Sequence, residues 1–227
     1  MTTQILFIRH GETAWNRIKR IQGHIDIALA DTGVEQARRL GHRFAEEARA
    51  GARLDAIWAS DLIRAQQTAQ PVAQALGLPV QLVPGLRERH YGAFQGHDSS
   101  EIAERFPDDY AHWQTRDPGF TPPEGESQRV FYHRVLHALE PLVAAHPDGR
   151  IAVLTHGGVL DCVYRFANGL PLDAPRNWPL LNTSVNVVDF QREGGVTQAR
   201  IVEWGDVAHL GGVSADDGLK RMPSSGR

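Results

Sequence analysis

The sequence predicts an α/β protein in which helices cover both faces of a mostly parallel sheet, a three-layer α/β/α sandwich. Short apolar segments of strand length end abruptly and lead into segments with helical periodicity. Two alternating segments near the end of the chain predict an antiparallel edge. A helical insertion between these units is expected to cover the ends of the strands.

The first predicted strand covers residues 5–8 and stops at Arg9, His10 and Gly11. Ligands of open α/β sheets bind at the carboxyl ends of the parallel strands. An arginine can hold phosphate oxygens through two parallel hydrogen bonds, and an imidazole can act as nucleophile or base. An Arg-His pair is also common at exposed strand ends. Whether Arg9 and His10 form a functional site therefore depends on the residues that follow the other strands.

Residues 32–49 follow with the apolar spacing of a long amphipathic helix, and Thr32 is its expected cap. Residues 56–59 predict the second strand. Ser60 or Asp61 is the expected N-cap of the next helix, so that Arg64 falls in its first turn. Pro71 is expected to kink or split this helix.

Two further segments place polar side chains at the same edge. Residues 86–92 place Glu88 after a short extended stretch. Residues 151–155 predict a strand that ends at His156 and Gly157, before a helix over 159–166. Because parallel strands end at one edge of the sheet, these side chains can converge with those that follow the first strand. The sequence therefore predicts a ligand-binding site at the carboxyl ends of the parallel strands.

The remaining elements complete the predicted domain, residues 1–210. Two short helices over 98–106 and 108–116 and a Pro/Gly-rich loop over 118–125 form the insertion. A helix over 127–145 follows. The hairpin pairs 184–190 with 196–202 around 193–195. Residues 211–227, rich in Gly, Ser and Asp, are expected to be a disordered tail.

Composition narrows the function class. The chain has 227 residues, enough for one sizeable α/β domain. Its net charge of −3 argues against binding nucleic acid or an anionic membrane through bulk charge. One cysteine allows no internal disulfide, and neither a signal peptide nor an 18-residue apolar run is visible. A cytoplasmic location is the expectation.

Other catalytic chemistries lack their motifs. No Gly-Lys pair of a P-loop, no Gly-x-Gly of a dinucleotide site and no Gly-x-Ser-x-Gly elbow occurs. Cys162 lies in an apolar helical segment and is interpreted as a packing residue. His133 and His137 have the i, i+4 spacing of two zinc ligands, but no acidic residue lies between them. We interpret them as a half-exposed helix face and predict no metal site.

Taken together, the motifs resemble the histidine phosphatase superfamily, whose best-known members are the cofactor-dependent phosphoglycerate mutases. The similarity runs from about residue 4 to about residue 203. Four motifs carry it, in the family's order: Arg9-His10-Gly11-Glu12-Thr13, Ser60-Asp61-Leu62 with Arg64-Ala65 and Thr68-Ala69, Glu88 with Tyr91-Gly92, and His156-Gly157.

The resemblance implies a phosphohistidine mechanism without metal or cofactor. His10 would be the nucleophile, and Glu88 the proton donor and later the base that activates water. Cationic and imidazole donors would stabilise the phosphoryl group, and the implied donors are Arg9, Arg64 and His156. Implied or expected substrate contacts are Asn16, Gln22, Gly23, His90, Tyr91 and Gly157.

The acceptor of the phosphoryl group stays open. The Glu88-Arg89-His90-Tyr91-Gly92 pattern is close to that of the mutases. The mutases carry a lysine and then a pair of adjacent arginines after this pattern. The only lysines here are Lys19 and Lys220, and Trp113-Gln114-Thr115-Arg116 offers a single arginine. We therefore favour the broad-specificity phosphatase branch and a small phosphorylated metabolite as substrate. A mutase is the alternative, followed by a non-catalytic phosphate-binding module. The oligomeric state is not predicted.

Overall fold

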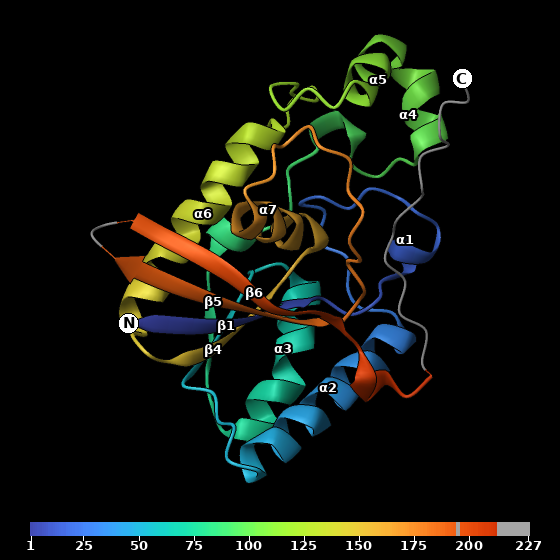
Figure 1. Cartoon of the computed structure of the whole chain (residues 1–227). Helices are drawn as coiled ribbons and strands as arrows, with labels where there is room; N and C mark the ends of the chain where they lie inside the picture. Colours follow the sequence, from blue (N-terminus) through green and yellow to red (C-terminus); the bar gives the residue numbers. More distant parts are fainter. Residues whose placement is uncertain (194–195, 213–227) are drawn as a thin grey trace.

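The computed structural model describes residues 1–193 and 196–212 (Figure 1). Its centre is a six-stranded sheet with the strand order β3-β2-β4-β1-β5-β6. The strands are β1 (Thr2–Arg9), β2 (Ala56–Ala59), β3 (Val80–Leu82), β4 (Arg150–Thr155), β5 (Val185–Glu193) and β6 (Val196–Asp206). The first four strands in this order pair in parallel, and β5 and β6 add the predicted antiparallel edge. The predicted fold class is confirmed.

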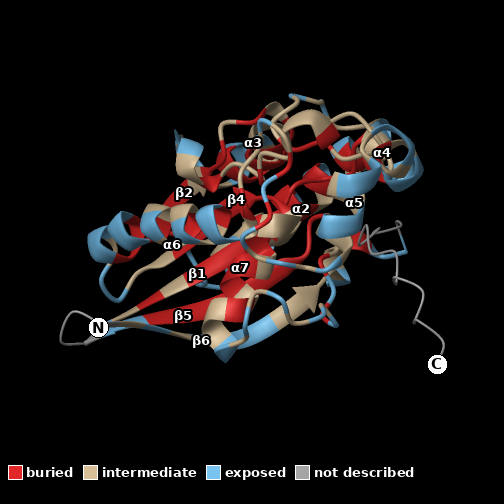
Figure 2. Cartoon of the chain, turned by 90° about the horizontal axis from the view of Figure 1, so that it is seen from above, coloured by how far each residue is buried: buried red, intermediate tan, exposed pale blue. Residues whose placement is uncertain are grey.

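Helices cover both faces of the sheet because side chains of β1 alternate between them. Leu6 and Ile8 pack in one apolar cluster with α2 (Asp31–Arg49) and α3 (Ile63–Leu76). Ile5 and Phe7 pack in a second cluster with α6 (Gln128–Ala145) and α7 (Gly157–Asn168). Figure 2 shows β4, β1 and β5 as largely buried and the edge strand β6 as partly exposed.

The predicted insertion is also present. A short helix, α1 (Ala14–Arg17), lies after β1, and the insertion itself contains α4 (Ser99–Arg105) and α5 (Pro107–Gln114). Short 3-10 turns occur at η1 (Pro84–Leu86), η2 (Gly92–Phe94) and η3 (Ala208–Leu210). Phe94, Ile102 and Phe120 form a buried cluster that is separate from the two sheet cores. The insertion therefore has its own apolar centre.

Several local predictions are wrong. The helix for which Thr32 is the expected cap begins at Asp31, and its N-cap is Ala30, two residues earlier than expected. Leu62, and not Ser60 or Asp61, caps α3. The Ser60 hydroxyl lies 2.8 Å from His156 Nε2, and the Asp61 carboxylate accepts from Arg87 at 2.8 and 2.6 Å. Pro71 lies inside α3, which continues across it, so the proline does not split the helix.

Glu88 also has a different setting from the one expected. The edge strand β3 ends at Leu82 and is followed by η1, so Glu88 lies in a loop and not directly after a strand. The predicted tail falls almost entirely outside the described residues, which end at Gly212. None of the helices within the described ranges is long and apolar enough to cross a membrane.

The separate centre of the insertion can be tested by Phe94→Ala. Phe94 is fully buried, so the truncation should lower the free energy of unfolding by about 3–5 kcal/mol, measured by urea denaturation. Val130→Ala, at an exposed position of α6, is the control and should change it by no more than about 0.5 kcal/mol. Equal effects of the two variants would mean that Phe94 does not hold the insertion together.

Candidate active site

The pairing of β1 with β4 brings the first and last motifs together. The two strands run parallel with Arg9 opposite Thr155. The backbone N–H of His10 continues the ladder and donates to the carbonyl of Thr155 at 2.8 Å. His10 and His156, each one residue beyond its strand, therefore lie side by side, with ring centroids 5.3 Å apart. Both are buried.

Hydrogen bonding defines which nitrogen of the His10 ring carries a proton. Nδ1 lies 2.7 Å from the carbonyl oxygen of Gly11. A carbonyl only accepts hydrogen bonds, so Nδ1 carries the proton and Nε2 keeps its lone pair. Burial, with the positive charges of Arg64 and Arg9, holds the pKa of His10 well below 6.5. The ring is neutral at physiological pH, with a defined basic nitrogen.

Arg64 is buried in the first turn of α3, as predicted. Its Nη1 and Nη2 donate to the carbonyls of Ile25 and Gly23, at 3.0 and 2.7 Å. Its Nε is buried and has no partner among the described residues. Burial lowers the pKa of Arg64 to about 10, so it stays charged at neutral pH. Arg9 reaches across from β1 and donates to the carbonyl of Leu180.

His156 occupies the N-cap of α7. Its Nε2 lies 2.8 Å from the hydroxyl oxygen of Ser60, at the end of β2. Its Nδ1 is buried without a partner in the described part of the chain. Burial and the charge of Arg64 lower its pKa well below 6.5. The ends of β1, β2 and β4 thus meet around two neutral imidazoles and a buried cation.

Glu88 reaches the same site from the loop after η1. One carboxylate oxygen accepts from the backbone N–H of Arg89 at 2.8 Å, and the other accepts from Gly158 N–H at 3.0 Å. Gly158 lies in the first turn of α7, two residues after His156. A Cβ on Gly158 would lie 2.1 Å from the Glu88 carboxylate. Only glycine leaves room for this approach.

The segment after β1 contributes three further predicted residues. Asn16 is buried in α1 and forms a capping box with the N-cap residue Thr13, whose backbone N–H donates to the Asn16 side-chain oxygen at 2.9 Å. Its NH2 group is the remaining donor end. Gln22 is buried, and its Oε1 has no partner among the described residues. Gly23 holds Arg64 through its carbonyl, as described above.

The last three predicted contacts, Gly157, His90 and Tyr91, are all half-buried. Gly157 begins α7, and a Cβ there would lie 3.5 Å from Arg9 Nε. His90 packs edge-on against His24, with ring centroids 4.7 Å apart. Tyr91 packs between the guanidinium of Arg89 and Trp113 of the insertion. Burial, followed by the charge of Glu88, raises the pKa of Tyr91.

Sequence reasoning missed two supports of the site. The Asn182 side chain donates to the carbonyl of His10 at 2.8 Å, and Thr183 N–H donates to the carbonyl of Arg9 at 3.0 Å. Both residues are fully buried. The polar run 182–184, directly before the strand that pairs with β1, was the available signal. His24, whose contact with Glu88 is described below, belongs to no motif in the sequence.

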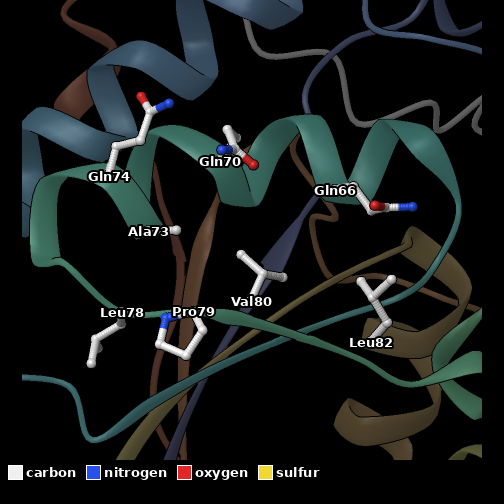
Figure 3. Close-up of a pocket in the computed structure, with 8 residues that line it drawn as sticks. All are labelled: Gln66, Gln70, Ala73, Gln74, Leu78, Pro79, Val80 and Leu82. Carbon is white, nitrogen blue, oxygen red and sulfur yellow. The ribbon is translucent and has the colours of Figure 1, made fainter.

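The remaining candidates lie elsewhere. His133 and His137 are exposed on α6, and Cys162 is buried as predicted. Across the described ranges, no three His, Cys, Asp or Glu side chains are grouped as a metal site requires. A groove of about 410 Å³ lies between α3 and β3, where Figure 3 shows glutamines above apolar residues. Its described lining includes none of the predicted site residues.

This arrangement combines a nucleophilic nitrogen, a buried cation and a fixed carboxyl group. A neutral imidazole beside arginines attacks an anionic electrophile whose charge those arginines offset. A carboxyl group at the same edge can exchange a proton with a leaving group or with water. The site therefore fits group transfer from a phosphate ester.

The chain belongs to the histidine phosphatase superfamily (branch 1), whose family model matches residues 5–205. It is 39% identical over 209 residues to phosphoglycerate mutase-like protein 4 of Arabidopsis thaliana, covering 91% of this chain and 86% of that protein. It is 38% identical over 213 residues to the metal-independent phosphoserine phosphatase of the same plant, covering 93% and 84%.

Among solved structures, YhfR of Bacillus stearothermophilus superimposes with a TM-score of 0.79 at 31% identity. The match covers 92% of this chain and 99% of that one. The predicted family and fold are confirmed. One plant relative is named as mutase-like and the other as a phosphatase. Their names therefore leave open whether the phosphoryl group passes to water or back to the product.

The fit between α7 and Glu88 predicts the effect of Gly158→Ala. The added methyl group would overlap the carboxylate and displace it, and a misplacement of about 1 Å in a reacting group costs about 10²-fold in rate. Gly157→Ala adds the same methyl group at van der Waals distance from Arg9 and should lose less. The measurement is kcat for both variants, and a larger loss in Gly157→Ala would contradict the assigned geometry.

The state of His10 can be measured directly. Its lowered pKa means that the folded protein keeps the ring neutral as pH falls through 6.5, where the unfolded chain takes up a proton. Imidazole ¹⁵N shifts of the folded protein should report neutral His10 at pH 6, with the proton on Nδ1. Full protonation at pH 6 would show that burial and the arginines do not control this ring.

Proposed function

We propose that this protein hydrolyses phosphomonoesters of small metabolites through a phosphohistidine intermediate on His10. The observation that carries the proposal is the hydrogen bond between His10 Nδ1 and the Gly11 carbonyl. It leaves Nε2 as the nucleophilic nitrogen in a ring that burial and two arginines keep neutral. A nitrogen in this state attacks phosphorus without first losing a proton.

In the first step, His10 Nε2 forms a bond to phosphorus as the bond to the ester oxygen breaks. Charge on the phosphoryl oxygens is met by Arg9, Arg64 and His156. The unpartnered Nε–H of Arg64 and the Nδ1 of His156 would gain a partner in a phosphoryl oxygen. Glu88 in its protonated form passes its proton to the departing alkoxide.

In the second step, Glu88 accepts a proton from water as the water oxygen attacks phosphorus. The bond between phosphorus and Nε2 breaks, its electron pair returns to His10, and inorganic phosphate leaves. The Asn16 and Gln22 amides donate further hydrogen bonds to phosphate, with the backbone at Gly23 and Gly157. His90 and Tyr91, which follow Glu88 in the same loop, contact the remainder of the substrate.

The proposed acceptor of the phosphoryl group is water, and not a hydroxyl group of the substrate. A mutase must hold a carboxylate as well as a phosphate, which requires a second anion clamp. Trp113-Gln114-Thr115-Arg116 of the insertion supplies a single arginine. The relative named as a phosphoserine phosphatase supports hydrolysis of a small phosphorylated metabolite. The mutase-like relative keeps phosphoglycerate mutase activity as the second candidate.

The central test traps the intermediate. Wild-type protein incubated with labelled substrate and quenched in alkali should carry base-stable, acid-labile phosphate, and His10→Ala should carry none. The variant should stay folded, because hydrogen bonds from the His10 backbone, and not its ring, extend the β1–β4 ladder. Undiminished labelling of His10→Ala would exclude His10 as the nucleophile.

Two activity assays separate the candidates. Hydrolysis of p-nitrophenyl phosphate should persist in EDTA, and its absence would favour a binding module. Conversion of 3-phosphoglycerate to 2-phosphoglycerate, with and without 2,3-bisphosphoglycerate, should be far slower than phosphate release. The reverse ranking would assign the protein to the mutases.

A further inference from the structure

Glu88 lies in a loop, yet its carboxylate has to meet a fixed position beside α7. Loop backbones are the less rigid parts of a fold, and β3, the preceding strand, ends six residues earlier, at Leu82. The carbonyls of η1 and of the residues after it have no continuing helix to donate to them. Something outside the loop must therefore hold this segment.

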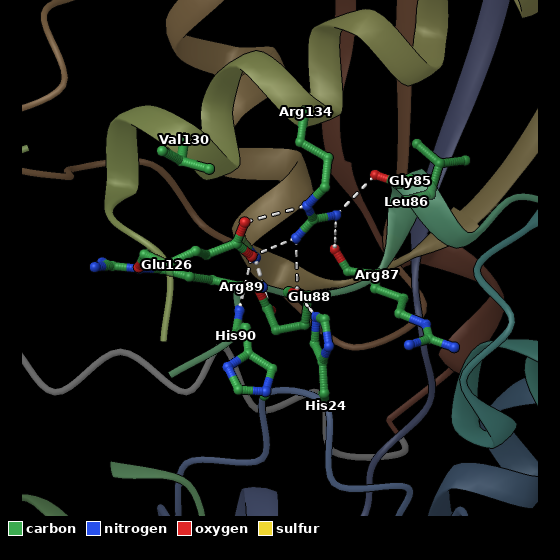
Figure 4. A network of polar contacts seen from close by, with 12 residues as sticks. His24, Gly85, Leu86, Arg87, Glu88, Arg89, His90, Glu126, Val130 and Arg134 are labelled. Atoms are coloured by element: carbon green, nitrogen blue, oxygen red, sulfur yellow. Dashed lines mark hydrogen bonds and ion pairs between the residues drawn. The ribbon is translucent and has the colours of Figure 1, made fainter. Parts of the chain in front are cut away.

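Arg134, a residue of α6, holds this segment. Figure 4 shows the Arg134 side chain reaching from this helix to the loop that carries Glu88. Nη1 donates to the carbonyls of Gly85 and Arg87, at 2.8 and 3.1 Å. Nη2 donates to the carbonyl of Glu88 itself, at 3.1 Å. One guanidinium thus binds three of the four carbonyls from residue 85 to residue 88.

Glu126, just before α6, completes the contact. Its carboxylate accepts from Nε and Nη2 of Arg134, at 3.2 and 2.5 Å. The same carboxylate accepts from His90 N–H at 2.8 Å, and the backbone N–H of Glu126 donates to the His90 carbonyl at 2.8 Å. The loop is therefore held on both sides of Glu88.

A guanidinium has five N–H donors, and the five contacts of Arg134 use all of them. Arg134 therefore has no donor left for a phosphate or for another part of a substrate. The guanidinium carbon of Arg134 also lies over the Phe131 ring, 5.0 Å from its centroid. Any effect of Arg134 on the reaction must pass through the segment that it holds.

We propose that Arg134, oriented by Glu126, is a positioning residue that fixes the backbone of residues 85–90 so that Glu88 delivers its proton to the leaving group. The inference rests on the proposed function, in which Glu88 is the general acid.

His24 links the same segment to the phosphate site. Its Nε2 lies 2.7 Å from the Glu88 carbonyl, and because a carbonyl only accepts, this nitrogen carries the proton. The flanking residues Gly23 and Ile25 hold Arg64 through their carbonyls. The Glu88 carbonyl is thus held between α6 and the loop that orients Arg64. This makes the acid and the phosphate-binding arginine parts of one hydrogen-bonded unit.

The test uses the leaving group as its readout. An alkyl phosphate such as phosphoserine needs a proton on its leaving oxygen, whereas p-nitrophenolate leaves without one. Single-turnover phosphorylation of His10 is measured with both substrates, and the ratio of the two rate constants reports protonation. Arg134→Met should lower the alkyl-to-aryl ratio by about 10²-fold, the cost of a misplaced reacting group.

The matched variants separate positioning from stability. Arg129→Met makes the same change at an exposed position of α6 and should keep the wild-type ratio. Arg134→Lys keeps the charge but offers three donors in place of the planar fork, so it should lower the ratio as well. Glu126→Gln keeps an oxygen for His90 N–H and should lower it less. These two milder variants carry the test if Arg134→Met does not fold.

A double variant shows whether the effect passes through Glu88. Residues that act as a unit are not additive, so adding Arg134→Met to Glu88→Gln should remove little further rate on phosphoserine. Multiplicative losses would overturn the inference. So would Arg134 variants that slow both substrates equally, because that is the result of a merely structural role.

Glu88→Gln alone decides the proposed role on which the inference rests. If Glu88→Gln slows both substrates equally, Glu88 is not the acid, and that part of the proposed function fails. If Glu88→Gln lowers the ratio and the Arg134 variants do not, the proposed function stands and only the positioning role is wrong.

Discussion

The parallel pairing of β1 with β4 is the constraint on which the site depends. It sets Arg9 opposite Thr155, so that the chain turns away from the sheet at His10 and His156 together. A shift of one residue in this register would turn every side chain of β1 to the other face. The two apolar clusters, which take alternate residues of β1, therefore hold the site in register as well as the fold.

Burial gives the site its electrostatic character. Arg64 is held by the carbonyls of Gly23 and Ile25, not by a carboxylate, so its hydrogen bonds orient the guanidinium without neutralising its charge. Removing a charge from water is costly, and here the cost appears as the lowered pKa of Arg64. The same burial and charge keep both imidazoles neutral. A dianionic phosphate is the kind of ligand that offsets this concentration of positive charge.

Regular elements were predictable because each carries a local signal. The strands around residues 5–8, 56–59 and 151–155 are apolar runs that stop at polar residues, and the structure confirms them. Helix starts were less predictable: Thr32 lies inside α2, where its hydroxyl accepts from Arg17, and Ser60 bonds to His156 in place of capping α3. Each hydroxyl has a hydrogen-bond partner that is far away in the sequence. Capping rules use only the residues next to a helix start, so they do not predict such partners.

The sequence by itself determined the fold class, the family and which side chains reach the carboxyl edge of the sheet, because strand ends and motifs are local in the chain. Only the tertiary structure decided which nitrogen of His10 carries its proton, since that depends on the direction of the Gly11 carbonyl. It also decided how Glu88 is held. Arg134 lies 46 residues from Glu88 along the chain, and no spacing rule connects a helix face to the loop that it packs against.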